Sequence, residues 1–533
     1  LNTFKLNEIF VLNKFWFEMA KIAVIGAGAS GMTATKACLE EGLQVVVYEK
    51  TRFTGGLWRY HEDDVSEIAS VAKSTIINSS KEMSAFSDFP PPKEYPNYMH
   101  NTMMVNYIDL YGKSFDFEKF VKFNHQITSC EPAKDFEETG RWKLKIKNLT
   151  DGNQFEELFD GVMVCTGHHT TPSVPQFEGE EKFKGKVMHT HSYKKPDGFQ
   201  DKNVVVIGIG NSGGDAAVEL STVAKNVYLS TRRGTWVVNR VGPSGLPADF
   251  MFLRRSKWIL FELLPYDFVC SMEEKNLNKR FDHSRYQLKP EHHIFSQHVF
   301  VNDALPNRIL SGTIKVKGNI KRFTENGVIF DGDQQETQCD IVLLATGYKV
   351  EFPFISKSLI PTDRNQVELF KYMFSPRLTH PKTLAFIGLI QPIGAIFPIS
   401  EIQSRWFTLL MNNKLSLPSK DEMMKDIRKK RLAMEKRFYS CERHTVQVDW
   451  IPFMDEIAQM INAKPNLLKY FFTDPKLWHA LWFGPCLPYQ YRLNGPHPWP
   501  KAKETILTVF DRIEAPFKTK TNITSNQSKN NSI

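Results

Sequence analysis

Residues 201–234 read DKNVVVIGIGNSGGDAAVELSTVAKNVYLSTRRG, and this stretch decides the expected fold. Its first apolar run, residues 204–207, is short and β-branched, as is typical of a buried parallel strand. A G-x-G-x-x-G turn follows, and it leads into a helix and a second strand at residues 226–231. Such glycines allow a tight bend and close approach of a pyrophosphate to the helix N-terminus, so we predict a dinucleotide-binding unit. The turn glycines are Gly208, Gly210 and Gly213.

The end of the second strand indicates which dinucleotide binds there. A carboxylate at this position would accept a hydrogen bond from the ribose 2′-hydroxyl of NAD. The chain instead has Arg232 followed by Arg233, and two guanidinium groups suit a 2′-phosphate. We therefore predict NADPH; the alternative is an ordinary glycine turn beside a basic surface pair. The other residues of this unit expected to contact the coenzyme are Asn211, Ser212, Gly214 and Asp215.

A second unit of the same kind lies near the start of the chain, at residues 21–60, KIAVIGAGASGMTATKACLEEGLQVVVYEKTRFTGGLWRY. Here Glu49 follows the second strand, 23 residues after Gly26, where a carboxylate can accept from a ribose hydroxyl. Since Glu49 marks a nucleotide without a 2′-phosphate, this unit predicts FAD. The turn residues expected to contact FAD are Gly26, Ala27, Gly28, Ala29, Ser30 and Gly31.

A glycine pair follows the first unit. Gly55 and Gly56 precede Leu57 and Trp58, and two glycines allow the backbone to approach a flavin closely. We expect Gly56, Leu57 and Trp58 to contact FAD, although for Trp58 alone core packing is an equal alternative. The two units differ in chemistry at the strand end, which implies two different dinucleotides. Together they predict a flavoprotein that takes hydride from NADPH.

Length and composition are those of a large globular protein. The 533 residues are 41% hydrophobic and 24% charged, which is consistent with two or more domains. Lys and Arg number 68 against 59 Asp and Glu, and no dense basic block argues for nucleic acid binding. The seven scattered cysteines include no CxxC pair, so we expect reduced, buried thiols. The histidine pairs at 168–169 and 292–293 have no third ligand at metal spacing, so no metal is expected.

The N-terminal segment is unusual because it lacks an initiator methionine. Its apolar residues are interrupted by Asn13 and Lys14, and no small-residue cleavage site follows, so we do not expect a signal peptide. Our hypothesis is that Met19 starts the native protein. No uncharged apolar run reaches about 18 residues, so no transmembrane helix is predicted.

Residues 183–193, FKGKVMHTHSY, carry a motif that connects the chain to a family. Phe183, Gly185, His189 and Tyr193 have F-x-G-x-x-x-H-x-x-x-Y spacing just before the second glycine turn. With this motif the chain resembles the animal flavin-containing monooxygenases of the dimethylaniline N-oxide-forming type, from about residue 21 to about residue 520. The resemblance also rests on GAGASG at 26–31, GGLW at 55–58, NSSKEM at 78–83, CTGHH at 165–169, GIGNSGGD at 208–215, STRRG at 230–234, LATGY at 344–348 and QPIGAIFPISEIQSRW at 391–406.

The resemblance implies an α/β fold with two dinucleotide-binding, Rossmann-like domains. The NADPH domain is inserted into the FAD domain, and the C-terminal part is mostly helical. The expected order is a non-native or disordered extension at 1–20, the first part of the FAD domain at 21–195, the NADPH domain at 196–335 with an insertion at about 234–302, the second part of the FAD domain with the helical region at 336–515, and a disordered polar tail at 516–533.

The resemblance also implies the reaction. In this family NADPH reduces FAD, O2 then forms a C4a-hydroperoxyflavin, and the terminal oxygen passes to a soft nitrogen or sulfur nucleophile. Asn78 matches the active-site asparagine before SKEM, and its amide can hydrogen-bond the peroxide without titrating. The alternative for Asn78 is a turn residue. Ile77 and Ser79 are expected beside the flavin, and Gln391 near the nicotinamide ribose.

The expected partners are a small-molecule amine or sulfide and O2. Residues 250–261 combine aromatic and aliphatic side chains with a basic cluster, which suits either a peripheral membrane contact or a buried helix. The family implies the cytosolic face of the endoplasmic reticulum membrane. The polar sequence after Lys520 departs from the family's hydrophobic tail, so a cytosolic location is the alternative. The sequence does not indicate an oligomeric state, and a homodimer is one option.

Other functions fit parts of the sequence. Baeyer–Villiger oxygenation of ketones is one, because residues 387–406 resemble an isoform type with that bias, although dedicated Baeyer–Villiger enzymes have Trp at the position of Tyr193. NADPH oxidase activity is another. A catalytically silent NADPH sensor is a third, and the intact glycines, Glu49, Asn78 and Arg232 argue against it.

Overall fold

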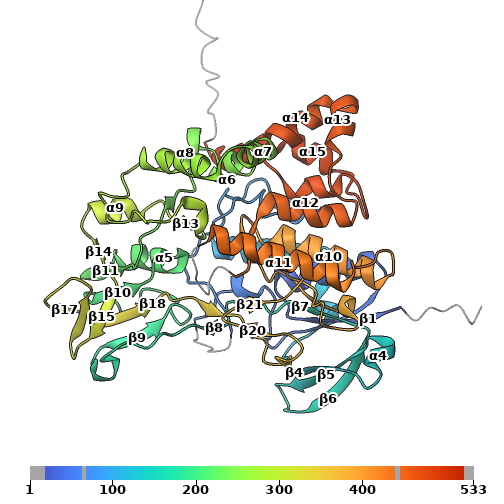
Figure 1. The fold of residues 1–533 in the computed structure, drawn as a ribbon, viewed down its shortest axis with the longest axis horizontal. Coiled ribbons are helices and arrows are strands. Elements are labelled where there is room, and N and C mark those ends of the chain that lie inside the picture. The colour runs from blue at the N-terminus through green and yellow to red at the C-terminus, as the bar shows by residue number, and fades with distance from the viewer. Residues whose placement is uncertain (1–18, 63–67, 439–444, 521–533) are drawn as a thin grey trace, which may run out of the picture.

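The computed structural model describes residues 19–62, 68–438 and 445–520. Two lobes, each built on a five-stranded parallel sheet, lie side by side, and a layer of helices runs along one edge of both (Figure 1). The hypothesis about residues 1–18 and the prediction for residues 521–533 lie outside the described residues. The expected α/β class with two Rossmann-like units and a helical C-terminal part is confirmed.

The first sheet is formed by strands from both ends of the chain. Its central strand is buried from Ile22 onward, as its apolar run predicts, and it pairs in parallel with its neighbours on both sides. A segment that returns after the second lobe adds the edge strand. The strands, in order across the sheet, are β22 (Leu384–Phe386), β7 (Gly161–Val164), β1 (Lys21–Ile25), β2 (Gln44–Tyr48) and β3 (Val121–Lys122).

The second sheet has the same design, with the strand before its glycine turn in the centre. Its strands, in order, are β14 (Ile314–Lys317), β11 (Asn226–Ser230), β10 (Asn203–Ile207), β18 (Ile341–Leu344) and β9 (Lys186–His189). Strand pairing moves both borders drawn from the sequence. β9 lies before the expected border at 196 and β18 after the one at 335, yet both pair within this sheet. β18 is buried in the second lobe, and the half-buried Val187 and Met188 of β9 pack against its core.

Each lobe also carries a three-stranded antiparallel sheet. Its residues lie, in the sequence, between strands of the parallel sheet of the same lobe. The first lobe has β4 (His125–Pro132), β5 (Trp142–Asn148) and β6 (Gln154–Phe159), and the second has β15 (Ile320–Phe323), β16 (Gly327–Phe330) and β17 (Thr337–Gln338). The lobes therefore repeat one topology.

The two passages between the lobes pair with each other. β8 (Thr171–Pro172) runs out of the first sheet, β19 (Tyr348–Lys349) runs back, and the two pair antiparallel. Ser173 N–H donates to the Gly347 carbonyl at 2.8 Å. The second lobe thus enters and leaves through one narrow two-stranded connection.

The insertion at 234–302 forms helices and short strands that bridge the lobes. Its elements are β12 (Val237–Val238), α6 (Ala248–Phe252), α7 (Arg255–Leu263), α8 (Tyr266–Asn278) and β13 (Phe300–Val301), and α9 (Leu305–Leu310) follows. The Arg255 guanidinium is buried and pairs with Asp455 in the C-terminal region, and Cys486 N–H donates to the Leu253 carbonyl at 2.7 Å. The alternative of a packed helix therefore holds for this part of residues 250–261.

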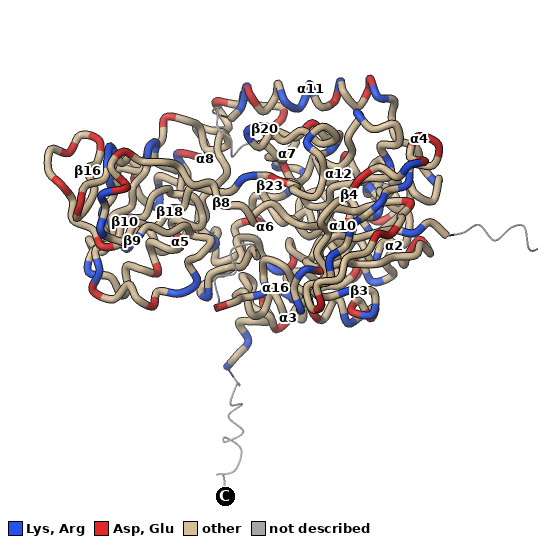
Figure 2. Tube along the Cα trace, turned by 90° about the horizontal axis from the view of Figure 1, so that it is seen from below, with Lys and Arg blue, Asp and Glu red and all other residues tan. Residues whose placement is uncertain are grey.

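The C-terminal region is helical, as expected. Its helices are α10 (Phe397–Met411), α11 (Lys420–Arg437), α12 (Trp450–Met460), α13 (Leu467–Thr473), α14 (Pro475–Phe483), α15 (Ala502–Leu507) and α16 (Val509–Glu514), and a 3-10 turn occupies Ala515–Phe517, where a disordered tail was expected. α11 lies on the surface and carries mixed charges along its length (Figure 2). It begins at Ser419 with a reciprocal capping box to Glu422.

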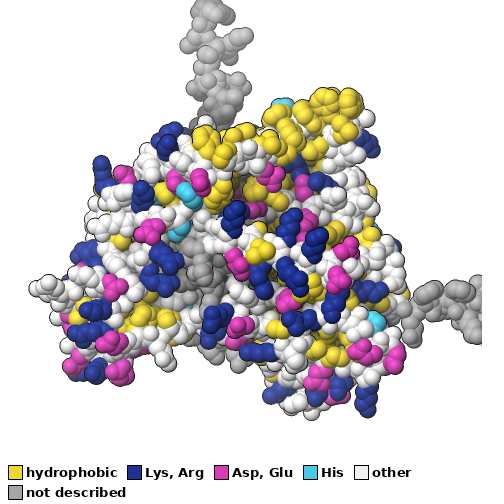
Figure 3. Space-filling view, in the orientation of Figure 1, with side chains coloured by type: hydrophobic (Ala, Val, Ile, Leu, Met, Phe, Trp, Pro, Cys, Tyr) yellow, Lys and Arg dark blue, Asp and Glu magenta, His cyan; other side chains and the backbone are white. Residues whose placement is uncertain are grey.

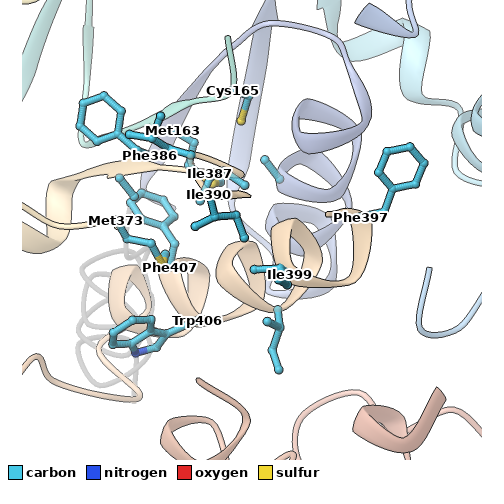
Figure 4. Packing of buried hydrophobic residues seen from close by; sticks show 14 of the residues in the cluster. Met163, Cys165, Met373, Phe386, Ile387, Ile390, Phe397, Ile399, Trp406 and Phe407 are labelled. Carbon is cyan, nitrogen blue, oxygen red and sulfur yellow. The ribbon is translucent and has the colours of Figure 1, made fainter. Parts of the chain in front are cut away.

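The main core joins the first sheet to the C-terminal region. α10 is buried over almost its whole length and packs on α2 (Ala29–Glu40), the helix after the first glycine turn. Figure 4 shows Phe407 of α10 beside Met373, with Met163 and Phe386 of the sheet close by. Because α10 is buried on all sides, its polar side chains included, it is a core helix that packs against α2.

Candidate functional site

The first glycine turn is built so that only glycine fits at two of its three positions. Gly26 has a φ of +105°, and a Cβ there would lie 2.8 Å from the Cys165 carbonyl. A Cβ on Gly31 would lie 1.9 Å from the Gly26 carbonyl oxygen, so helix and strand approach as closely as backbones can. Gly28 is the N-cap of α2, whose free N–H groups point out of the turn.

Glu49 lies at the end of β2, where its carboxylate is held by three donors. Ala27 N–H donates to Oε2 at 2.8 Å, while the Thr51 N–H and hydroxyl donate to Oε1 at 2.9 Å each. The side chain is half-buried. An anion fixed in this way is oriented toward the glycine turn and keeps lone pairs for a ribose hydroxyl.

The glycine pair packs against the turn. Gly55 N–H donates to the Ala27 carbonyl at 3.1 Å, and a Cβ on Gly56 would lie 3.1 Å from the Gly28 Cα. Trp58, half-buried at the end of this turn, meets Phe397 edge-on at 6.3 Å between ring centroids. Ser30 completes the contact with α10, since its hydroxyl lies 3.0 Å from that of Ser400. Predicted FAD residues 26–31, 49 and 56–58 thus gather at one end of the first sheet.

Asn78 lies in a loop that packs on the same end of α10. Phe86 of this loop stacks on Phe397 at 5.4 Å, so Phe397 is contacted from both the glycine pair and the Asn78 loop. The side-chain oxygen of Asn78 accepts a hydrogen bond from the Arg240 guanidinium at 2.6 Å. Ile77 is buried with its N–H on the Met99 carbonyl, and the Ser79 hydroxyl lies 2.7 Å from that of Ser84.

The second glycine turn repeats the first but is more open. Gly208 has a φ of +106° and lies against the Ala345 carbonyl, and a Cβ on Gly213 would lie 2.0 Å from the Gly208 carbonyl oxygen. Gly210 differs, because no described atom lies within 4 Å of the Cβ position there. It is the N-cap of α5 (Asn211–Leu220). The space beside Gly210, at a free helix N-terminus, fits a pyrophosphate.

Three residues predicted to bind the coenzyme have structural partners within the chain. The Asn211 side-chain oxygen accepts from Val301 N–H at 2.9 Å, and the Asp215 carboxylate accepts from the Asn302 side-chain amide at 2.8 Å. Burial raises the pKa of Asp215 to about 6. A Cβ on Gly214 would lie 2.1 Å from the Phe300 ring. These residues fasten β13 to α5, while Ser212 stays exposed at the turn.

Arg232 and Gln391 lie in different parts of the structure. Arg232 is exposed directly after β11, as a 2′-phosphate ligand requires. Gln391 begins the short strand β23 (Gln391–Ile393), which pairs with β24 (Gln447–Asp449). The side-chain oxygen of Gln391 accepts from the side-chain amide of Gln447 at 2.6 Å. Helix α10 begins only at Phe397, because Gly394, with a φ of +147°, turns the chain against the Trp450 ring.

The F-x-G-x-x-x-H-x-x-x-Y motif is structural. It forms the edge strand β9, where Gly185 lies against the Phe183 ring and the Asp340 carbonyl. His189 is buried, which lowers its pKa to about 4, and its Nδ1 accepts from His191 N–H at 3.0 Å. The Tyr193 hydroxyl donates to Glu219 at 2.7 Å.

Arg240 and Asp249 belong to this site and were missed by sequence reasoning. Both lie in the insertion, and both contact the Asn78 loop, since Asp249 accepts from Ser80 N–H at 2.6 Å. No motif or periodicity marks either residue. The insertion carries many other charged side chains, so charge alone does not single out these two.

Two glycine turns with opposite charges at their strand ends define an oxidoreductase that uses two dinucleotides. The family model described as flavin-binding monooxygenase-like matches residues 19–533. The chain belongs to this family, and the predicted class, an FAD- and NADPH-dependent monooxygenase, is confirmed.

Curated relatives match along nearly the whole chain. Identity to flavin-containing monooxygenase 5 of Rattus norvegicus is 50% over 502 residues, which is 94% of this chain and 93% of the relative. Identity to dimethylaniline monooxygenase (N-oxide-forming) 2 of Oryctolagus cuniculus is 44% over 503 residues, 94% of each chain.

Solved structures share the fold at lower identity. S-allyl-L-cysteine S-oxygenase from Allium sativum matches with a TM-score of 0.64 and 23% identity, over 92% of this chain and 98% of that one. An oxidised steroid monooxygenase bound to NADP matches with a TM-score of 0.60 and 14% identity, over 83% and 97%.

Within residues 19–62, 68–438 and 445–520, no group of three or more His, Cys, Asp or Glu could hold a metal ion. None of the helices in these ranges is long and apolar enough to cross a membrane. The six cysteines that the structure describes are all buried, with free thiols; Cys441 lies outside them.

Proposed function

We propose that this enzyme oxygenates soft nitrogen and sulfur nucleophiles, namely amines and sulfides of the xenobiotic type. One atom of O2 enters the substrate, and the other leaves as water with the two electrons of NADPH. The proposal is supported by 44% identity to a relative whose name specifies N-oxide formation. The observation that carries it is Asn78, a neutral hydrogen-bonding residue on the loop that shares Phe397 with the proposed FAD site.

We propose that FAD binds at the first glycine turn. The turn and α2 would hold the pyrophosphate, Glu49 would accept from the ribose, and the backbone at Gly56, Leu57 and Trp58 would face the ring system. The fit is supported by the fixed Glu49 carboxylate and the open helix N-terminus. When bound, the flavin supplies the redox chemistry and activates O2.

We propose that NADPH binds at the second turn. The space beside Gly210 would take the pyrophosphate, Arg232 the 2′-phosphate, and Gln391 would lie near the nicotinamide ribose. Asn211, Gly214 and Asp215 would then act indirectly, by fixing β13 against α5.

Asn78 is the proposed catalytic residue. We expect Asn78→Asp to abolish oxygenation while leaving FAD content and reduction by NADPH intact, because a carboxylate cannot donate a hydrogen bond. The measurement is product formed and peroxide released per NADPH consumed. Full oxygenation by this variant would exclude the role.

Substrate class is tested by product analysis with a matched amine, sulfide and ketone. We expect N-oxide and sulfoxide to dominate. If the ketone is converted to its ester faster than either is oxygenated, the enzyme is a Baeyer–Villiger oxygenase instead. Peroxide release with all three would indicate an NADPH oxidase.

We further propose that one face of the protein adsorbs to a lipid surface, with the cytosolic face of the endoplasmic reticulum as the membrane. Apolar side chains gather along the edge formed by α7, α8, α13 and α14 (Figure 3). Leu263 and Phe472 are 78% and 74% exposed. Lys469 and Lys476 border this face, as suits anionic headgroups. The exposed apolar residues are Leu260, Leu263, Phe268, Leu468, Phe471, Phe472 and Phe483.

Flotation with phosphatidylcholine vesicles, with and without phosphatidylserine, tests this surface. We expect the double variant Leu263→Glu, Phe472→Glu to lose vesicle binding. Leu310→Glu is the matched control, because Leu310 is equally exposed at the end of α9, outside the helices that form this face. If flotation is unchanged and the wild type elutes as a dimer that the double variant disrupts, a second copy covers this face.

A further inference from the structure

We infer that Arg240 is a positioning residue that fixes the direction of the Asn78 amide. The inference rests on the catalytic role proposed for Asn78. It assigns the insertion a part in the chemistry of the other lobe, since Arg240 follows β12 in the second lobe and Asn78 belongs to the first.

The guanidinium of Arg240 contacts three consecutive residues of the Asn78 loop. One N–H donates to the Asn78 side-chain oxygen at 2.6 Å and also lies 3.4 Å from the Ile76 carbonyl. Nε–H donates to the Ile77 carbonyl at 3.3 Å. The planar guanidinium therefore donates to backbone and side-chain oxygens at the same time, which the ammonium group of a lysine could not reproduce.

This contact decides which way the amide faces. A guanidinium only donates hydrogen bonds, so Asn78 must present its oxygen to Arg240. The amide NH2 is then on the opposite branch, directed away from Arg240. Because NH2 is the only donor of the side chain, the pairing leaves a donor available for an oxygen atom bound elsewhere in the site. Without Arg240 the amide could flip and present its acceptor instead.

The arginine is itself held in place. Its side chain is 13% exposed and pairs with Asp303, which also accepts from Arg240 N–H at 3.0 Å. Tyr98 of the first lobe donates its hydroxyl to the Arg240 carbonyl at 2.8 Å. The charge of the pair is thus balanced within the protein, and the guanidinium is pre-organised.

A second contact fixes the far side of the loop. Asp249, in the first turn of α6, is half-buried and accepts from Ser80 N–H at 2.6 Å. Arg240 holds the carbonyls before Asn78, and Asp249 holds the amide after it. The loop is therefore clamped on both sides of the catalytic residue by the same insertion.

The first test replaces the arginine in the holoenzyme. We expect Arg240→Met to keep FAD but to raise peroxide released per NADPH roughly tenfold, the effect of losing one hydrogen bond to a charged group. Arg240→Lys should restore only part of the coupling, which is the amount of product formed per NADPH consumed. Arg280→Met is the control, because Arg280 donates to the Asp303 carbonyl at 2.7 Å without reaching Asn78.

A double-mutant cycle separates positioning from general support. If Arg240 acts through Asn78, adding Arg240→Met to Asn78→Ala should change the coupling no further. A second, equal loss in the double variant would overturn the inference. If Asn78→Ala releases peroxide in place of product while Arg240→Met forms as much product per NADPH as the wild type, the inference about Arg240 fails and the catalytic role of Asn78 stands. If Asn78→Ala is itself fully coupled, the proposed catalytic role fails.

Hydrogen exchange of the holoenzyme without NADPH or substrate gives a readout independent of turnover. In Arg240→Met, the amides of residues 76–84 should exchange faster while those of α2 stay protected. In Arg280→Met both should match the wild type. Unchanged exchange of the loop in Arg240→Met would overturn the clamp.

Discussion

The two glycine turns share a backbone design but differ at the second glycine and at the strand end. In the first lobe, a Cβ on Gly28 would lie 3.6 Å from the Gly56 Cα, and Glu49 is half-buried with three donors around it. In the second lobe, Gly210 faces open space, and Arg232 is exposed. The first turn is enclosed by the chain and the second is open to solvent.

This difference fits two cofactors that are used differently. An enclosed site whose side chains are already oriented retains its cofactor. An open site with an exposed cation allows its coenzyme to exchange with solvent. We therefore expect FAD to stay bound through many turnovers, while NADP+ is released and NADPH rebinds. Substitutions at equivalent positions of the two turns test whether the turns differ in packing and in cofactor binding as described.

The largest effect is expected where the turns are alike, at the third glycine. A Cβ at Gly31 or Gly213 would overlap a backbone oxygen, so Gly31→Ala and Gly213→Ala should each destabilise their own lobe by about 3 kcal/mol. Thermal unfolding of the purified variants measures this. Gly210→Ala is the control, because its Cβ would meet no described atom within 4 Å. Equal stability of all three variants would contradict the close packing.

The next effect concerns the exposed cation. Arg232→Ala should raise KM for NADPH by about tenfold to a hundredfold and leave that for NADH nearly unchanged, because a charge-assisted bond to the 2′-phosphate is lost. Steady-state reduction of the flavin with both coenzymes provides the comparison. Arg322→Ala, an exposed arginine of the same lobe, should change neither value. Equal changes for NADH and NADPH would place the 2′-phosphate elsewhere.

A smaller effect should separate the second glycines. Gly28→Ala should lower FAD retention by about tenfold, since the added methyl occupies the approach of the pyrophosphate. Gly210→Ala should keep FAD and weaken only NADPH binding. The ratio of flavin to protein after gel filtration, and the KM for NADPH, distinguish the variants. Loss of FAD from Gly210→Ala would show that the turns are not independent.

The smallest effect is expected from pH, at the connection between the lobes. Burial lowers the pKa of His169 and His189 to about 4, so both rings are neutral in the folded protein. The unfolded chain takes up protons below about pH 6.5, so their contribution to stability is complete above that pH and is lost as pH falls toward 4. His189→Asn, whose oxygen can replace Nδ1, should reduce this loss by about 2 °C in Tm or more. His479→Asn, at an exposed position, should not; an unchanged pH profile in both variants would exclude His189.

Local sequence patterns predict most of the fold because the deciding interactions are local. Each strand, glycine turn and helix of a nucleotide unit is consecutive, so spacing alone specifies Gly26, Gly31 and Glu49. The domain borders could not be obtained in this way. β9 and β18 join the second sheet through pairings with distant strands, and neither has a feature that assigns it to one lobe.

The candidate site divides in the same way. Asn78 was found by its family motif, but its partner Arg240 lies 162 positions away in a segment without periodicity. Asn211 and Asp215 sit at positions typical of coenzyme contacts, yet they bind β13, because the insertion returns its end to that place. Contacts between segments so far apart depend on tertiary packing, which local patterns do not encode.

The paired passages β8 and β19 have a mechanical consequence. A lobe attached only through such a narrow connection would swing as a rigid body about it. Here the insertion adds a second attachment, through Arg255 to Asp455 and Leu253 to Cys486, on another side of the lobe. Two separated attachments remove the freedom to rotate. We therefore expect the two parallel sheets to keep their relative orientation through the catalytic cycle.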